Sequence, residues 1–189
     1  LSMVGFLVSL PSLSWAQDDE PTTSFGSQCF ESRSELKNAV ETYLLDNSSI
    51  HIAETYGWPI GTWCVDQVED FSGIFRSANA LAFNEPLTDW NLTNAVNLDD
   101  MFAFNLAFNQ PINHFNIGKV TSMKGTFRVA ESFNQPLDMW DTSNVQNMDS
   151  TFQLALKFDG NISTVRRRHI SLFAPFLRPV SPHLSTWPI

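Results

Sequence analysis

The sequence is poor in several residue types, and each shortage excludes a class of protein. Only 11 of the 189 residues are Lys or Arg, against 20 Asp or Glu, so the chain lacks the basic face that nucleic-acid binding requires. It has only 8 glycines, and neither a phosphate-binding glycine loop nor a dinucleotide-binding fingerprint is present. No apolar run approaches the roughly 18 residues that a membrane-spanning helix needs.

Patterns that carry chemistry are missing as well. The four histidines show no ligand spacing such as His-x-x-x-His, and the two cysteines are too far apart for a Cys-x-x-Cys metal site. No Gly-x-Ser-x-Gly nucleophile motif occurs. We therefore expect no metal, no cofactor and no catalytic residue, and an enzyme is the least favoured class of function.

Aromatic residues are plentiful, and they recur in a repeat. Residues 83–102 (FNEPLTDWNLTNAVNLDDMF), 108–127 (FNQPINHFNIGKVTSMKGTF) and 133–152 (FNQPLDMWDTSNVQNMDSTF) repeat one pattern at an interval of 25. A looser first copy occupies residues 56–75, and a fifth copy starts at Phe158 and then fails. Because a 25-residue unit cannot bury its apolar positions alone, stacked copies are expected to bury them together.

The repeat defines apolar columns if the first residue of each unit is called position 1. Positions 1, 4, 5, 8, 13, 16 and 20 keep their character between units, and the residues between them are mostly polar and variable. The position-1 column is Tyr56, Phe83, Phe108, Phe133 and Phe158, and the position-20 column is Phe75, Phe102, Phe127 and Phe152. This pattern predicts a repeat solenoid in which each column is a continuous internal stack.

A proline at position 4 of each full unit has no N–H for a strand ladder, which places it at a strand start or a corner. We therefore predict a short parallel strand over positions 5–9 (137–141 in the last full unit), a second extended stretch over positions 13–16, and a tight helical turn over positions 18–24. Asparagines at position 2 are interpreted as a stacked amide ladder, with ligand binding as the alternative (Asn84, Asn109, Asn134).

A helix is predicted to precede the repeats and to cover the first coil. Ser32-Arg33-Ser34-Glu35 is a capping box, and apolar residues then recur at helical spacing up to Asp46. Residues 32–55 are therefore assigned to a capping helix and linker. Cys29 and Cys64 are expected to form a disulfide that ties this cap to the repeats, and two free buried thiols are the alternative.

The first residues indicate export. An apolar run followed by Ser14-Trp15-Ala16 has the pattern of a secretory signal peptide over residues 1–16, with a short buried helix as the alternative. An acidic leader over residues 17–31 follows. In an exported chain, three Asn-x-Ser/Thr sequons become glycosylation sites (Asn47, Asn91, Asn161). The predicted location is extracellular or at the cell surface.

The unit at residues 133–152 resembles the BspA-like leucine-rich-repeat surface proteins, also known from mycoplasma lipoproteins. The similarity covers residues 56–163 and repeats in register. It implies a leucine-rich-repeat-like solenoid in an exported protein that binds other molecules, and it implies no reaction. Residues 164–189 depart from the pattern, with four arginines and no acid. They are interpreted as a poorly ordered tail, either an atypical C-terminal cap or translated intron or shifted frame.

The variable positions 6, 7 and 9 suggest a recognition face. Positions 7 and 9 flank the buried position 8, so strand alternation would point them outwards, and position 6 is included because it is polar. The face comprises Thr88, Asp89, Asn91, Asn113, His114, Asn116, Asp138, Met139 and Asp141. Its expected partner is a protein or a glycan at a cell surface. The alternative function is a structural wall or matrix component that self-associates.

Overall fold

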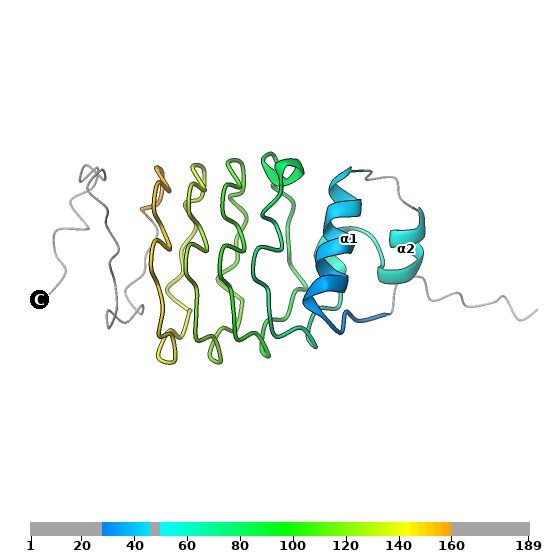
Figure 1. Cartoon of the computed structure of the whole chain (residues 1–189), viewed down its shortest axis with the longest axis horizontal. Helices are drawn as coiled ribbons and strands as arrows, with labels where there is room; N and C mark the ends of the chain where they lie inside the picture. The colour runs from blue at the N-terminus through cyan, green and yellow to red at the C-terminus, as the bar shows by residue number, and fades with distance from the viewer. Residues whose placement is uncertain (1–27, 46–49, 160–189) are drawn as a thin grey trace, which may run out of the picture.

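The computed structural model describes residues 28–45 and 50–159, which form a row of stacked coils beyond a helical N-terminal part (Figure 1). Helices α1 (Arg33–Leu45) and α2 (Ile50–Tyr56) precede the repeats. The first coil contains two short 3-10 helices, η1 (Ile60–Thr62) and η2 (Ala78–Ala80). The coils begin at Tyr56, Phe83, Phe108 and Phe133 and are numbered one to four below.

Several sequence predictions lie outside the described residues. These are the signal peptide over 1–16, the leader up to residue 27, the sequon residues Asn47 and Asn161, and the tail over 164–189.

The prediction of a leucine-rich-repeat-like solenoid with short parallel strands and a helical turn in each coil is wrong. Across residues 28–45 and 50–159 the backbone forms no β-strand. Successive coils are joined by isolated parallel bridges at position 15, which pair Asp70 with Asn97, Asn97 with Ser122, and Ser122 with Asn147. The expected helical turn over positions 18–24 is also missing from coils two to four, and only η2 in the first coil approaches it.

Tight turns within each coil explain why strands do not form. In coil four the N–H of Trp140 donates to the carbonyl of Leu137, and the N–H of Val145 donates to the carbonyl of Thr142. The same bonds between residues three apart recur in coils two and three at positions 10 and 13, and at positions 16 and 19. These turns use N–H groups within their own coil. At positions 16 to 22 alternate N–H groups do donate to the next coil, but positions 18 and 22 of coils two to four have positive φ angles, so the backbone there is not extended as a strand requires.

The interior consists of aromatic columns, as the repeat predicts. The position-1 rings of Phe83, Phe108 and Phe133 stack with centroids 6.0 and 6.1 Å apart. The position-20 rings of Phe75, Phe102, Phe127 and Phe152 stack at 5.3, 5.7 and 5.4 Å. Within one coil the two columns also touch, since the rings of Phe102 and Phe108 lie 4.2 Å apart. Each ring is therefore packed against rings above, below and beside it.

Buried threonines at position 19 were not foreseen, because the sequence presents them as polar. Thr126 and Thr151 are fully buried. The hydroxyl of Thr126 lies 3.0 Å from the carbonyl oxygen of Leu98 in the preceding coil and 2.7 Å from that of Met123 in its own coil. Thr151 makes the equivalent pair of contacts one coil later. These hydroxyls join adjacent coils from inside the core.

The asparagines at position 2 form the predicted ladder. The side-chain oxygen of Asn84 accepts a hydrogen bond from the N–H of Asn109 at 2.8 Å, and that of Asn109 accepts one from Asn134 at 2.8 Å. The N–H of Asp159 continues the series by donating to Asn134 at 2.8 Å. The ladder satisfies one backbone donor at each junction from coil two onwards.

Helix α1 lies against the first coil and supplies cations to its carbonyls. The Nε of Arg33 donates to the carbonyl of Ser72 at 2.7 Å, and the Nζ of Lys37 donates to the carbonyl of Gly73 at 2.7 Å. In later coils the position-17 carbonyl, equivalent to that of Ser72, accepts an N–H from the preceding coil. Arg33 therefore replaces a donor that a preceding coil would supply.

The cap is also held covalently. Cys29 and Cys64 form the predicted disulfide, and the N–H of Phe30 donates to the carbonyl of Cys64 at 2.9 Å. The side chain of Ser32 accepts a hydrogen bond from the N–H of Glu35 at 3.2 Å, as a capping box requires.

Candidate recognition surface

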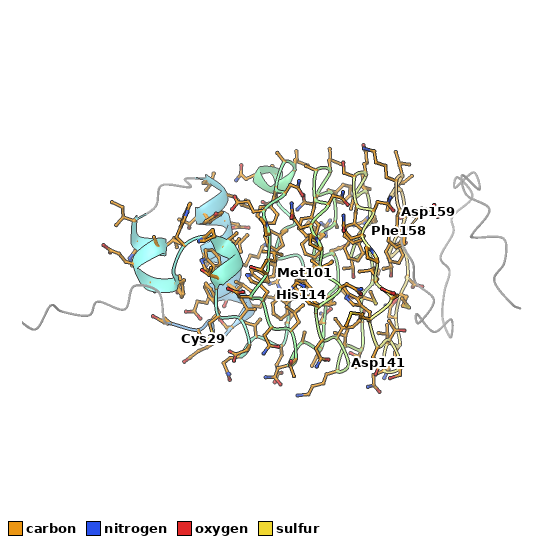
Figure 2. All side chains as sticks on the ribbon, turned by 180° about the vertical axis from the view of Figure 1, so that it is seen from behind. Cys29, Met101, His114, Asp141, Phe158 and Asp159 are labelled. Atoms are coloured by element: carbon orange, nitrogen blue, oxygen red, sulfur yellow. A yellow bond between two sulfur atoms is a disulfide. The ribbon has the colours of Figure 1, made fainter. Side chains whose placement is uncertain are left out.

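Of the three positions in the predicted recognition face, position 9 carries side chains that close local turns. The oxygen of Asn91 accepts the N–H of Thr93 at 3.1 Å, and the equivalent oxygens of Asn116 and Asp141 accept the N–H two residues further on at 3.2 and 2.9 Å. Asp141 lies at the lower edge of the stack in Figure 2. All three residues are exposed, but each has a structural role that its position explains.

Position 6 is half-buried in coils three and four. The side-chain amide of Asn113 donates to the carboxylate of Asp138 at 2.8 Å, and its oxygen accepts the N–H of Met139 at 3.0 Å. These two contacts join coil three to coil four. Asn113 and Asp138 were included only because they are polar, and their contacts give them a role in stacking.

His114 at position 7 compensates for a missing tryptophan. In coils two and four the indole N–H at position 8 donates to the position-5 carbonyl of the preceding coil, from Trp90 to Ile60 at 2.8 Å and from Trp140 to Ile112 at 3.1 Å. Coil three has Phe115 at position 8, which has no N–H. There the Nε2 of His114 lies 3.2 Å from the corresponding carbonyl of Leu87. Because a carbonyl can only accept, this nitrogen is the donor.

The remaining members of the face project into solvent. Thr88 and Asp89 in coil two are exposed, and the Met139 side chain is 73% exposed in coil four. With the outer side of the His114 ring, they form a strip that differs from coil to coil: a hydroxyl and a carboxylate, then an imidazole, then a thioether. Such a surface suits contact with an extended ligand rather than enclosure of a small substrate.

Metal-ligand atoms gather at one place in the described part of the chain. The side-chain ligand atoms of Cys29, Cys64 and Asp66 lie within 4.8 Å of one another. Both sulfurs belong to the disulfide, so neither is available as a thiolate. The cluster therefore has no set of ligands for a metal while the disulfide is intact.

The two tyrosines with shifted pKa values join helix α1 to coil two and helix α2 to helix α1. Burial raises the pKa of the Tyr43 phenol, and its 2.6 Å hydrogen bond to Glu85 together with the negative charge there raises it further. Burial also raises the pKa of Tyr56, followed by the hydrogen bond and charge of Glu35. Both phenols donate to carboxylates and stay neutral at physiological pH, so they act as structural links.

Comparison with known proteins places the chain in a family. No helix in the described residues is both long and apolar enough to cross a bilayer. No curated protein and no solved structure matches the chain significantly. A family model covers residues 27–165, which include the cap and all four coils, and the family is related to the BspA-like mycoplasma surface repeat proteins. The match gives no direct evidence of a leucine-rich repeat. The chain belongs to the family described as Mycoplasma protein of unknown function, DUF285.

Proposed function

We propose that this protein is a non-catalytic recognition module that binds a protein or a glycan outside the cell or at its surface. The observation that carries the proposal is the contrast between a repeated interior and a varied exterior. Successive coils keep the same buried rings and the same hydrogen bonds across their junctions. The exposed position-7 side chain changes from Asp89 to His114 to Met139. A stack of constant coils presenting variable side chains is the arrangement that repeat proteins use for binding.

The hydrogen bonds within the stack reduce the number of predicted face residues that are free to contact a ligand. Position 9 closes turns, and Asn113 and Asp138 bond to each other across the junction between coils three and four. The proposed contact residues are therefore Thr88, Asp89 and Met139, with the exposed side of His114. The strip carries one carboxylate and one imidazole, so it favours a polar partner with hydrogen-bond donors.

Two features support a location outside the cytoplasm. Disulfides persist in oxidising compartments, and the structure contains one between Cys29 and Cys64. The sequon residue Asn91 is exposed, and its side-chain oxygen accepts a hydrogen bond from the hydroxyl of Thr93 at 2.5 Å. The relation of the family to surface repeat proteins agrees with both features.

The proposal is tested by binding of the purified full chain to arrays of glycans and surface proteins. A variant with Thr88→Ala, Asp89→Ala and Met139→Ala should lose at least tenfold in affinity for any ligand found. The matched control is Glu69→Ala with Gln146→Ala, which changes exposed side chains at position 14. Unchanged binding by the triple variant, with the control also unchanged, would show that the ligand contacts another face.

Self-association is a second candidate, because at one end of the described stack several N–H groups have no acceptor among residues 28–45 and 50–159. In coils one to three, alternate N–H groups between positions 16 and 20 donate to the next coil. In coil four the N–H groups of Met148, Ser150 and Phe152 have no acceptor in the described part of the chain. In the first coil of a second copy, one of the three equivalent acceptors, the carbonyl of Ser72, is already bonded to Arg33. Light scattering tests this candidate: a mass that rises with concentration would favour assembly over the recognition module.

A further inference from the structure

Trp58 differs from the other tryptophans in the part of the chain that the structure describes. Trp63, Trp90 and Trp140 are buried, and each donates its indole N–H to a backbone carbonyl at 2.8 to 3.1 Å. Trp58 is 43% exposed, and its N–H has no acceptor among the described residues. Its ring packs against that of Tyr43, with centroids 4.6 Å apart. Much of this indole is therefore open to solvent.

Glu85 occupies the same position of the next coil, position 3. In coils three and four this position holds Gln110 and Gln135, whose side-chain amides donate to the asparagine of the preceding coil. Coil one has Gly57 in place of that asparagine, and a carboxylate has no N–H to donate. Glu85 instead accepts the hydroxyl of Tyr43 at 2.6 Å. It forms no ion pair with a Lys or Arg of the described residues, so its charge is not neutralised there.

Tyr43 fixes the indole and the carboxylate relative to each other. Its side chain is buried, its ring packs on Trp58 and its hydroxyl donates to Glu85. The two groups therefore lie no further apart than one tyrosine side chain with a contact at each end. Burial raises the pKa of Tyr43, and the bond to Glu85 raises it further, so the hydroxyl keeps its proton and remains a donor at neutral pH. The pair is thus held in place without a ligand.

We propose that Trp58 and Glu85 form a binding site for an arginine side chain of a partner protein. A cation is attracted to the face of an aromatic ring, and an indole attracts it most strongly. Because the guanidinium group is planar, it can stack on the indole and donate to the carboxylate in the same pose. A guanidinium within about 6 Å of the ring centre reaches a carboxylate oxygen through a hydrogen bond of about 2.8 Å.

The charge of the chain favours a cation over other ligands. The formal net charge is −9, so a cationic partner is attracted and an anionic one repelled. A neutral sugar could stack on the indole but would not neutralise Glu85. A lysine ammonium is a compact charge and cannot stack as a plane. The inference rests on the proposed function, since it names the kind of partner that the module recognises, but it assigns that partner a site outside the recognition face.

The test is a nuclear magnetic resonance titration of the full chain with the peptide acetyl-Gly-Arg-Gly-amide. The indole N–H signal of Trp58 is identified by its loss in Trp58→Phe. It should shift saturably, with a dissociation constant on the order of 10 mM for a single side chain. The same peptide with citrulline, which has the shape of arginine without its charge, should bind at least fivefold more weakly. Equal shifts with the two peptides, or a response only to methyl glucoside, would overturn the proposal.

Variants separate the site from general attraction by charge. Glu85→Gln introduces the residue that coils three and four already hold at position 3, so the fold should be retained. It should weaken peptide binding about threefold to tenfold. Trp58→Leu, followed through the signals of the peptide, should weaken it at least fivefold. Glu131→Gln is the matched control, because it removes an exposed carboxylate of coil three and should leave binding unchanged.

A further variant separates this site from the recognition face. Thr88→Ala, Asp89→Ala and Met139→Ala together should bind the peptide as the parent chain does, even if they lose an array ligand. Failure of the peptide to bind would overturn this site alone, whereas failure of the arrays would bear on the proposed function. Undiminished binding by Glu85→Gln, an equal loss in Glu131→Gln, or loss of peptide binding in the triple variant would overturn the inference.

Discussion

His114 offers a direct test of how the coils are joined. Replacing it with Ala removes the donor 3.2 Å from the carbonyl oxygen of Leu87, a residue that is fully buried. That carbonyl keeps one further hydrogen bond, from the N–H of Trp90 at 3.3 Å, so it is weakened rather than orphaned. A lost hydrogen bond of this type costs about 1 kcal/mol. We expect His114→Ala to lower the free energy of unfolding by about that amount.

Restoring the tryptophan should rescue the loss. In the double variant His114→Ala, Phe115→Trp, the indole N–H would reach Leu87 as Trp90 reaches Ile60. The coils on either side hold Trp90 and Trp140 at the same position, so the position has a precedent for the larger ring. The larger ring can also cost about 1–3 kcal/mol by overpacking if the site cannot adjust. The single variant Phe115→Trp measures this cost and completes a double-mutant cycle.

The assay is urea denaturation of the four proteins, followed by tryptophan fluorescence and by circular dichroism. A coupling energy of about 1 kcal/mol, with the double variant more stable than the sum of the single changes, is the expected result. If His114→Ala is as stable as the parent, or if the coupling is zero, His114 does not substitute for the indole N–H and belongs only to the recognition face.

Three further predictions concern the core and the cap. Thr126→Val removes a buried hydroxyl that contacts two carbonyls, and should lower the unfolding free energy by about 1 kcal/mol in the same urea assay. Replacing Cys29 and Cys64 with Ser opens a loop of separation 35 and should cost roughly 4 kcal/mol; an unchanged melting temperature would contradict the role given to the cap. The raised pKa of Tyr43 means that the unfolded phenol ionises first, near pH 10, so stability is complete below about pH 10 and falls above it. Tyr43→Phe should reduce that alkaline loss in a pH series of melts, and an unaltered slope would show that ionisation of Tyr43 is not its cause.

The sequence predicted which residues are buried far better than it predicted the path of the backbone. A repeat shows which positions are equivalent, so Phe83, Phe108 and Phe133 could be assigned to one internal column. The same repeat carries little information on dihedral angles. A proline followed by alternating residues was interpreted as a strand, whereas local turns consume the donors that a strand needs.

The candidate site was predictable only in part, because the sequence pattern shows which side chains are exposed but not which hydrogen bonds they make. Alternation placed Asp89 and Met139 at the surface, where they lie. It could not show that His114 replaces a hydrogen bond lost at Phe115, since that depends on the carbonyl of a neighbouring coil. A phenylalanine or valine in a repeat predicts burial, and no sequence pattern indicates that Val129 has a positive φ.

The hydrogen bonds between coils have a consequence for how this chain can change in length. The bond from Asn109 to Asn84 and the bond from Asn134 to Asn109 span 25 residues each, and the two junctions are interchangeable. Adding or removing one whole unit would rebuild an identical junction and leave the cap at Arg33 and Lys37 undisturbed. A residue inserted within the hydrogen-bonded part of a coil would instead break this register, whereas coil one, from Tyr56 to Phe83, holds two extra residues near η2. Copy number is therefore the dimension along which this architecture can vary freely.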